Sequence, residues 1–446
     1  MALTDRYGNP VSTQSRAALE KYNEALDLIR LFHGDPIAAL DAALAEDTDF
    51  GGAWAARAGL LVTATDKAYA EETAKSLRAG AVASMNDRER MHLQAAQDWA
   101  EGRFIEGTMR YGRIAQENPR DVLALQYAHG GCFFTGMQSE LRDWPLQALR
   151  AFKKGEDGYS YIQGMAAFGL EECGDFARAD IYGRQAVEAD PRDGWAVHAV
   201  AHVNEMRGDL ETGIPWLAHN AQHWAPESGF AYHNWWHLAL LYLDKGDIAQ
   251  VLALYDEKVR PDVNAQVMLE LIDASALLWR LHLEGVDVSG RFEQLAPCWQ
   301  RAGEDAFYAF NDLHAVMAFL GAGRAADAER TLKAMRHAAA DGGDNRHMTC
   351  RVGLPLAEAF VAFEAGRYGE CVEKIMTTRG IAQRFGGSHA QRDILTLTAM
   401  HAALRGGLAA TAEAIAAERL AHKPQSPWAG RLARQARELR AQQRAA

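Results

Sequence analysis

Histidines and carboxylates recur at helical spacing in the middle of this chain. His198, His202 and Glu205 stand at i, i+4 and i+7 in "GWAVHAVAHVNEMRGD". His233 and His237 stand four apart in "YHNWWH". Residues at these intervals share one face of an α-helix. Imidazole changes its charge near neutral pH, and a neighbouring carboxylate can orient it, so the pattern indicates general acid–base catalysis.

Further polar residues follow in three downstream segments. They are Asp273 and Arg280 in "LELIDASALLWRL", Asn311 and His314 in "AFYAFNDLHAVMAFL", and His389, Arg392 and Asp393 in "GGSHAQRD". From His198 to His233 is 35 residues, from His233 to Asp273 is 40, and from Asp273 to Asn311 is 38. Any one of these pairs alone is typical of a solvated face or of an ordinary ion pair. Their recurrence at a nearly constant interval predicts one shared cavity instead.

The predicted site has two groups of residues. Those expected to be catalytic are His202, His233, His237, Glu205, Asp273, His314 and His389. Those expected to bind the substrate are Trp195, His198, Asn234, Trp236, Trp279, Arg280, Asn311, Arg392 and Asp393. The tryptophans would provide apolar walls, and the arginines would bind an anionic group.

The motifs of common cofactors are missing from the sequence. There is no HExxH, no GxGxxG between a strand and a helix, no GxxxxGK[ST] and no GxSxG. We therefore expect no cofactor. The alternative is a divalent metal such as zinc, with His198, His202 and His233 as its ligands.

The elements that must position these residues are helices. Strand-like alternation is nearly absent, and a short turn of Gly followed by Asp or Arg separates apolar segments. From Gly34 to Gly102 is 68 residues, twice 34, and from Gly174 to Gly208 is 34; Gly246 follows after 38. A period of 34 residues is the signature of tetratricopeptide repeats, in which stacked helical hairpins curve into a superhelix. The sequence thus predicts an all-α, tetratricopeptide-like α-solenoid.

No Gly/Ser-rich linker divides the chain, so we expect residues 1–446 to form a single continuous array. Within it, residues 1–30 are predicted to be an N-terminal cap segment. Residues 160–320 would be the central repeats that line the cavity. Residues 425–446, a basic amphipathic segment, would be a C-terminal capping helix, or else a contact with a partner.

Composition excludes several classes of function. The formal net charge of −12 argues against nucleic acid as the main partner, because phosphate binding requires a basic face. The five cysteines are widely spaced and form no CxxC, which argues against a disulfide framework or a cysteine-based zinc site. No apolar run is long enough for a membrane span, and the N-terminus lacks the apolar core of a signal peptide. A cytoplasmic protein without a membrane partner is expected.

Five segments also resemble a known family. "HAVAHVNEMRGDLETGIPWL", "HNWWHLALLYLDKGD", "LLWRLHLEGVDV", "FNDLHAVMAFLGAGR" and "GGSHAQRDI" are together similar to the tetratricopeptide repeat protein 38 family. The N-terminal "DRYGNPVSTQSRAALEKYNEAL" fits the same family, so the resemblance covers nearly the whole chain. It implies an all-helical, tetratricopeptide-like superhelix and no particular reaction.

Two functions remain open from the sequence. The first is an enzyme of hydrolase or lyase type that acts on a small polar or amide-bearing molecule in the concave cavity. The second is a non-catalytic scaffold that binds a peptide or a partner protein in its groove, the usual role of such repeats. The abundance of histidine favours the enzyme. A homodimer is compatible with either function.

Overall fold

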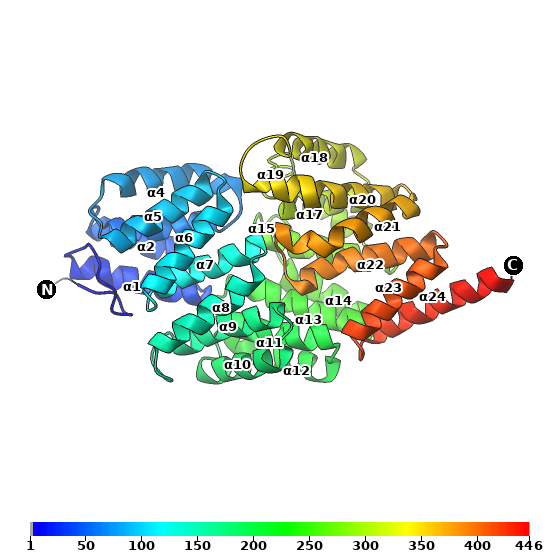
Figure 1. Ribbon diagram of the computed structural model, residues 1–446, viewed down its shortest axis with the longest axis horizontal. Coiled ribbons are helices and arrows are strands. Elements are labelled where there is room, and N and C mark those ends of the chain that lie inside the picture. Colours follow the sequence, from blue (N-terminus) through cyan, green and yellow to red (C-terminus); the bar gives the residue numbers. More distant parts are fainter. Residues whose placement is uncertain (1–2, 446) are drawn as a thin grey trace. The chain divides into compact units, whose positions relative to one another are not determined.

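The computed structural model describes residues 3–445, which form helices joined by short turns (Figure 1). Within this range, extended backbone pairs only in three isolated bridges, of which one joins Thr4 to Pro10. The predicted all-α class is therefore confirmed. The chain divides into two compact units. Unit 1 comprises the residues up to Val200 together with Asn220–Ala231, and unit 2 comprises Ala201–His219 and the residues from Tyr232 onward.

Unit 1 consists of helical hairpins in which consecutive helices pack against each other, as α5 and α6 or α9 and α10 do. Its helices are α1 (Arg16–Leu31), α2 (Pro36–Glu46), α3 (Gly51–Val62), α4 (Ala70–Val82), α5 (Asp87–Ala100), α6 (Phe104–Glu117), α7 (Val122–Thr135), α8 (Gln138–Ala148), α9 (Tyr159–Glu172) and α10 (Phe176–Ala189). It also contains the first half of α11 (Gly194–Arg207) and the end of α12 (Leu210–Trp224).

Unit 2 begins in the second half of α11 and contains most of α12. Its remaining helices are α13 (Ala231–Lys245), α14 (Ile248–Leu254), α15 (Met268–Leu283), α16 (Ser289–Trp299), α17 (Ala309–Gly321), α18 (Ala325–Ala338), α19 (Asp344–Met348), α20 (Leu354–Glu364), α21 (Tyr368–Thr378), α22 (His389–Arg405), α23 (Ala409–His422) and α24 (Pro427–Ala445). Besides the consecutive pairs, α15 packs against α17 and α22, and α20 also packs against both of these helices. The first helices of successive hairpins thus lie side by side, as a repeat protein requires.

The repeated Gly-Asp dipeptide has a structural role in the turns. Gly174, between α9 and α10, has φ +80°, and Gly246, between α13 and α14, has φ +91°. This left-handed conformation costs little for glycine. The following aspartate then caps the next helix, because Asp175 accepts from the Arg178 backbone N–H and Asp247 from that of Gln250, each at 3.2 Å. The other turn glycines named from the sequence, Gly34, Gly102 and Gly208, also have positive φ, and so do Gly323, Gly366 and Gly407 at later turns.

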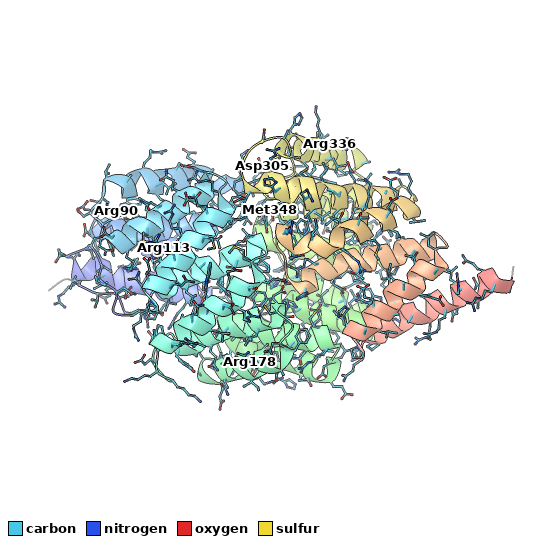
Figure 2. The ribbon with its side chains drawn as sticks, in the orientation of Figure 1. Arg90, Arg113, Arg178, Asp305, Arg336 and Met348 are labelled. Atoms are coloured by element: carbon cyan, nitrogen blue, oxygen red, sulfur yellow. The ribbon has the colours of Figure 1, made fainter. Side chains whose placement is uncertain are left out.

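Charged side chains gather on the outer faces of the helices. Arg113 of α6, Arg178 of α10 and Arg336 of α18 are exposed, and Figure 2 marks all three. At the end of the chain, α24 packs against α22 and α23 and buries Trp428 and Leu432. None of the helices formed by residues 3–445 has the length and the apolar composition that a membrane span requires. Against this background, a group of charged and titratable residues buried in unit 2 stands out.

Candidate functional site

Three buried histidines meet in unit 2. His202 comes from α11, and His233 and His237 come from successive turns of α13; their exposed fractions are 0%, 4% and 0%. The ring of His237 lies 4.4 Å from that of His202 and 4.9 Å from that of His233, measured between centroids. One ring nitrogen of each histidine lies within 4.8 Å of those of the other two. We call these residues the three-histidine cluster.

Two buried carboxylates orient two of these rings. His233 donates through Nδ1 to Oδ2 of Asp273 on α15 at 2.7 Å, and His237 donates through Nδ1 to Oε2 of Glu205 on α11 at 2.9 Å. Glu205 follows His202 by three residues, so the same helix provides one histidine of the cluster and the carboxylate that holds another. With the proton on Nδ1, the lone pair lies on Nε2, on the other side of the ring.

Burial sets the protonation of the cluster. Burial lowers the pKa of His237 well below its ordinary value, and the nearby His202, His233 and Arg280 lower it further. His237 is therefore a neutral imidazole at neutral pH, which is the form that binds a metal or accepts a proton. Burial raises the pKa of Asp273, although His233 and Arg280 act in the opposite direction.

A network of ion pairs reaches the cluster from the end of the chain. Lys423, directly after α23, places Nζ 3.5 Å from Oε1 of Glu205 and 3.7 Å from Oδ2 of Asp393. Arg419 binds both oxygens of Asp393, at 2.5 and 2.8 Å. Although burial raises the pKa of Asp393, Arg419 and Lys423 outweigh it and hold that pKa far below its usual range. Glu205 and Asp393 are thus balanced by two cations, Arg419 and Lys423, that were not among the predicted site residues.

An indole and a guanidinium pack beside the histidines. Trp236 stacks on His233 with ring centroids 5.3 Å apart and an angle of 14° between the rings. The Arg280 guanidinium lies 5.4 Å from the centre of the Trp236 ring and donates to the backbone carbonyls of Ala276 and Ala390 at 3.0 and 2.7 Å. Burial lowers the pKa of Arg280 to about 10, so its charge persists at neutral pH.

The donor set fits a divalent metal. Zinc takes imidazole nitrogens at about 2.0–2.1 Å, and catalytic zinc commonly has three protein ligands and an open position for water. Metal-binding histidines almost always donate their other ring N–H to a carboxylate or a carbonyl. His233 and His237 both make that bond. The site can therefore hold a metal through three imidazoles or, without one, transfer protons between imidazole and carboxylate.

The metal ligands predicted from the sequence were His198, His202 and His233. His198 lies one helical turn before His202 on α11, in the half of that helix that belongs to unit 1. There, with Trp195, it joins a group of aromatic residues. The His198 ring lies 5.0 Å from Trp195, 5.1 Å from Phe168 and 5.2 Å from Phe230. In unit 2, His237 lies beside His202 and His233.

The other predicted site residues of unit 2 lie in several surroundings. Trp279 packs against Phe360 and Phe363 of α20 and donates to Thr398 at 3.1 Å, so its contacts are those of a core residue. Asn234, on α13, and Asn311, on α17, are buried.

His314 and the residues of α22 have contacts of their own. His314 donates through Nδ1 to the Phe310 carbonyl at 2.7 Å, and burial lowers its pKa to about 4. His389, the first residue of α22, is partly exposed and has Nδ1 3.5 Å from Arg392. Arg392 also donates to the Gly387 carbonyl. Asp393 is bound by Arg419 and Lys423, as described above, and the cap of α22 is Ser388.

Arg419 and Lys423 were missed although the sequence carried a signal. They are four residues apart in "ERLAHK", so they share one face of a helix and its C-terminal end, just as the histidine pairs do. A scan of the sequence against models of known protein families finds no match. The function is therefore inferred from the chemistry of the site.

Proposed function

We propose that the three-histidine cluster binds a divalent metal such as zinc and forms the active site of a hydrolase or lyase. The substrate would be a small polar molecule, with an amide as the favoured reacting group. The observation that carries this proposal is the pair of buried carboxylates that bind Nδ1 of His233 and His237. Ordinary packing does not require two such pairs around a third imidazole, and burying so many ionisable groups is costly unless they are used.

Each residue has a defined task in this proposal. A metal held by the three imidazoles would supply Lewis acidity and lower the pKa of a bound water molecule. Asp273 and Glu205 fix the rings of His233 and His237 and keep Nε2 unprotonated. The Lys423 ammonium balances the Glu205 carboxylate. Trp236 covers one face of His233 and limits the access of water to that side.

The same residues define a metal-free version of the reaction. Neutral His237 would accept a proton from water at Nε2, and Glu205 would stabilise the resulting imidazolium through Nδ1. A peptide-binding scaffold is the other alternative. The near-complete burial of the three histidines supports the enzyme over that scaffold, because a peptide groove presents its binding residues to solvent.

Metal analysis of the purified protein tests the proposal. We expect about one zinc ion or other divalent metal per chain, and its loss in the single variants His202→Ala and His233→Ala. His347→Ala, which removes an exposed histidine of α19, is the matched control and should retain the metal. Hydrolysis of a panel of small N-acyl amino acids should disappear on treatment with a chelator and return when zinc is added. A metal-free protein that hydrolyses the panel would support the metal-free version.

Membership of the tetratricopeptide repeat protein 38 family is proposed on the five sequence segments named above. A cytoplasmic location and a homodimer stay predictions. Fractionation of cells and sedimentation of the purified protein would test them.

A further inference from the structure

A cavity lies in unit 1 and shares no residue with the three-histidine cluster. Its volume is about 560 Å³, within the range of pockets for small molecules. It is lined by the end of α1, the loop 154–158, the first turns of α9, the end of α10 and the segment that leads into α11. Figure 1 shows α9 and α10, which form two of its walls, side by side.

The lining of this cavity is acidic. Five lining residues carry carboxylates and two carry basic groups; the acids are Glu156, Asp157, Glu188, Asp190 and Asp193, and the bases are Arg30 and Lys154. Several of these charges are already compensated. Arg30 pairs with Asp157 at 2.7 Å, and Asp190 pairs with Arg192 at 2.9 Å. Glu156 pairs with Arg120 at 3.1 Å. Beyond these pairs the lining has two further carboxylates, Glu188 and Asp193, and one further base, Lys154, so a small excess of carboxylate disfavours an anionic ligand.

In the part of the chain that the structure describes, only one of the two carboxylate oxygens of Asp193 accepts hydrogen bonds. The side chain is buried, with 2% of the residue exposed, and its Oδ1 caps α11 by accepting from the backbone N–H groups of Trp195 and Ala196 at 3.1 and 2.9 Å. Within residues 3–445, Oδ2 has no hydrogen-bond partner. A buried carboxylate oxygen without a partner is unusual, because it loses its hydration without compensation.

The hydroxyl of Tyr161 is also buried and also lacks a hydrogen-bond partner among the described residues. Tyr161, on α9, lines the cavity with 3% of its surface exposed, and within residues 3–445 its hydroxyl has no hydrogen-bond partner either. Two buried oxygens without a hydrogen-bond partner in this range thus belong to residues that line one cavity of ligand size, which is partly open to solvent. Both can accept hydrogen bonds, and one carries the charge of a carboxylate.

We propose that this cavity binds a small organic cation through its ammonium group, with Asp193 Oδ2 as the counter-ion and the Tyr161 hydroxyl as a second acceptor. An ammonium group donates up to three hydrogen bonds and accepts none, so it complements these two oxygens. The excess of carboxylates also attracts a positively charged ligand. The rest of the ligand, beyond its ammonium group, would occupy the remaining volume of the cavity beside Gln163 and Arg30.

Burial raises the pKa of Asp193 to about 7, and the charge of Asp190 acts in the same direction. The backbone N–H groups of Ala196 and Trp195 and the charge of Arg30 oppose this shift. The cavity therefore holds a carboxyl group that ionises at an unusually high pH. A bound ammonium would provide the missing positive partner.

Calorimetric titration of the full-length protein tests this proposal. The probes are n-butylammonium and 1,4-diaminobutane, with butyrate as the anionic counterpart. We expect saturable binding of an amine, at one site per chain, and no binding of butyrate. Asp193→Asn should weaken amine binding at least about tenfold, because Asn keeps the helix cap but not the charge. Tyr161→Phe should weaken it several-fold.

Asp175→Asn is the matched control, because Asp175 caps the preceding helix α10 in the same way but does not line the cavity. It should leave amine binding unchanged. The His233→Ala variant should also bind the amine normally, which separates this site from the proposed metal centre. Absence of saturable binding by both amines would overturn the proposal. So would equal affinity in Asp193→Asn, or butyrate binding as tight as that of the amines.

Discussion

Replacement of Asp273 should weaken metal binding without removing a metal ligand. Asp273 is fully buried on α15 and contacts the cluster through its 2.7 Å bond with His233 Nδ1. Asp273→Asn keeps the shape and one acceptor oxygen but removes the charge. Asp273→Ala removes the acceptor as well. The His233 ring would then be a poorer electron donor and, in the alanine variant, would lose its fixed orientation.

The expected size of the effect follows from the nature of this bond. A hydrogen bond with a charged partner contributes about 1.5–3 kcal/mol. Loss of a carboxylate that holds a metal-binding histidine typically lowers metal affinity about 10–100-fold, or about 1.4–2.7 kcal/mol. The two estimates agree. We therefore expect about tenfold weaker zinc binding for Asp273→Asn and close to a hundredfold for Asp273→Ala.

Competition with a chromophoric zinc chelator at constant pH measures this affinity. Glu270→Gln is the matched control, because Glu270 is a buried carboxylate one turn earlier on α15 that pairs with Arg260 at 3.0 Å. It should destabilise the fold but leave zinc affinity within about twofold of the wild type. Equal losses in Glu270→Gln and Asp273→Asn would refute the reasoning, since a general disturbance of α15 would then explain both. Unchanged affinity in Asp273→Ala would refute it as well.

Three further predictions concern stability. His314 has a pKa of about 4 in the folded protein and about 6.5 in the unfolded chain, so the unfolded chain binds the proton first as the pH falls. The free energy of unfolding should therefore decrease by up to roughly 3 kcal/mol between pH 7 and pH 4. Urea unfolding should show a smaller decrease for His314→Gln over the same pH range. The pKa of Asp193 is raised to about 7 in the folded protein, so its stabilising contribution is present at low pH and is lost as the pH rises from about 4 through 7. Asp193→Asn should therefore unfold with the same free energy as the wild type at pH 4. At pH 8 its free energy of unfolding should be higher than that of the wild type by up to roughly 4 kcal/mol. Trp279→Ala should cost about 3–5 kcal/mol in the same assay and leave zinc affinity unchanged, because its contacts are Phe360, Phe363 and Thr398; a loss of zinc affinity would instead place Trp279 at the site.

The sequence predicted the helices of this protein well, for local reasons. Gly174 and Gly246 were recognised as turns because glycine adopts positive φ, and the aspartates that follow them cap helices. The polar face of α13 was recognised because His233 and His237 are four residues apart. Both signals lie within a few residues of chain, where spacing determines geometry.

The partners of those residues were not predictable in the same way. Spacing shows which side chains share a face, but not which atom of a distant helix meets them. His237 pairs with Glu205 across 32 residues, and Lys423 reaches Glu205 across 218. Trp195 and His198 share the repeat spacing of the other candidates, and the spacing did not predict their contacts with the aromatic residues of unit 1.

X-ray absorption spectroscopy of the zinc-loaded protein tests the central claim most directly. The account predicts a zinc ion with three imidazole nitrogens at about 2.0–2.1 Å and a light-atom ligand in the remaining position. The imidazole signal should decrease in His237→Ala and persist in the exposed-histidine variant His347→Ala. A spectrum with sulfur ligands, one without imidazole scattering, or one that His237→Ala leaves unchanged would contradict the account.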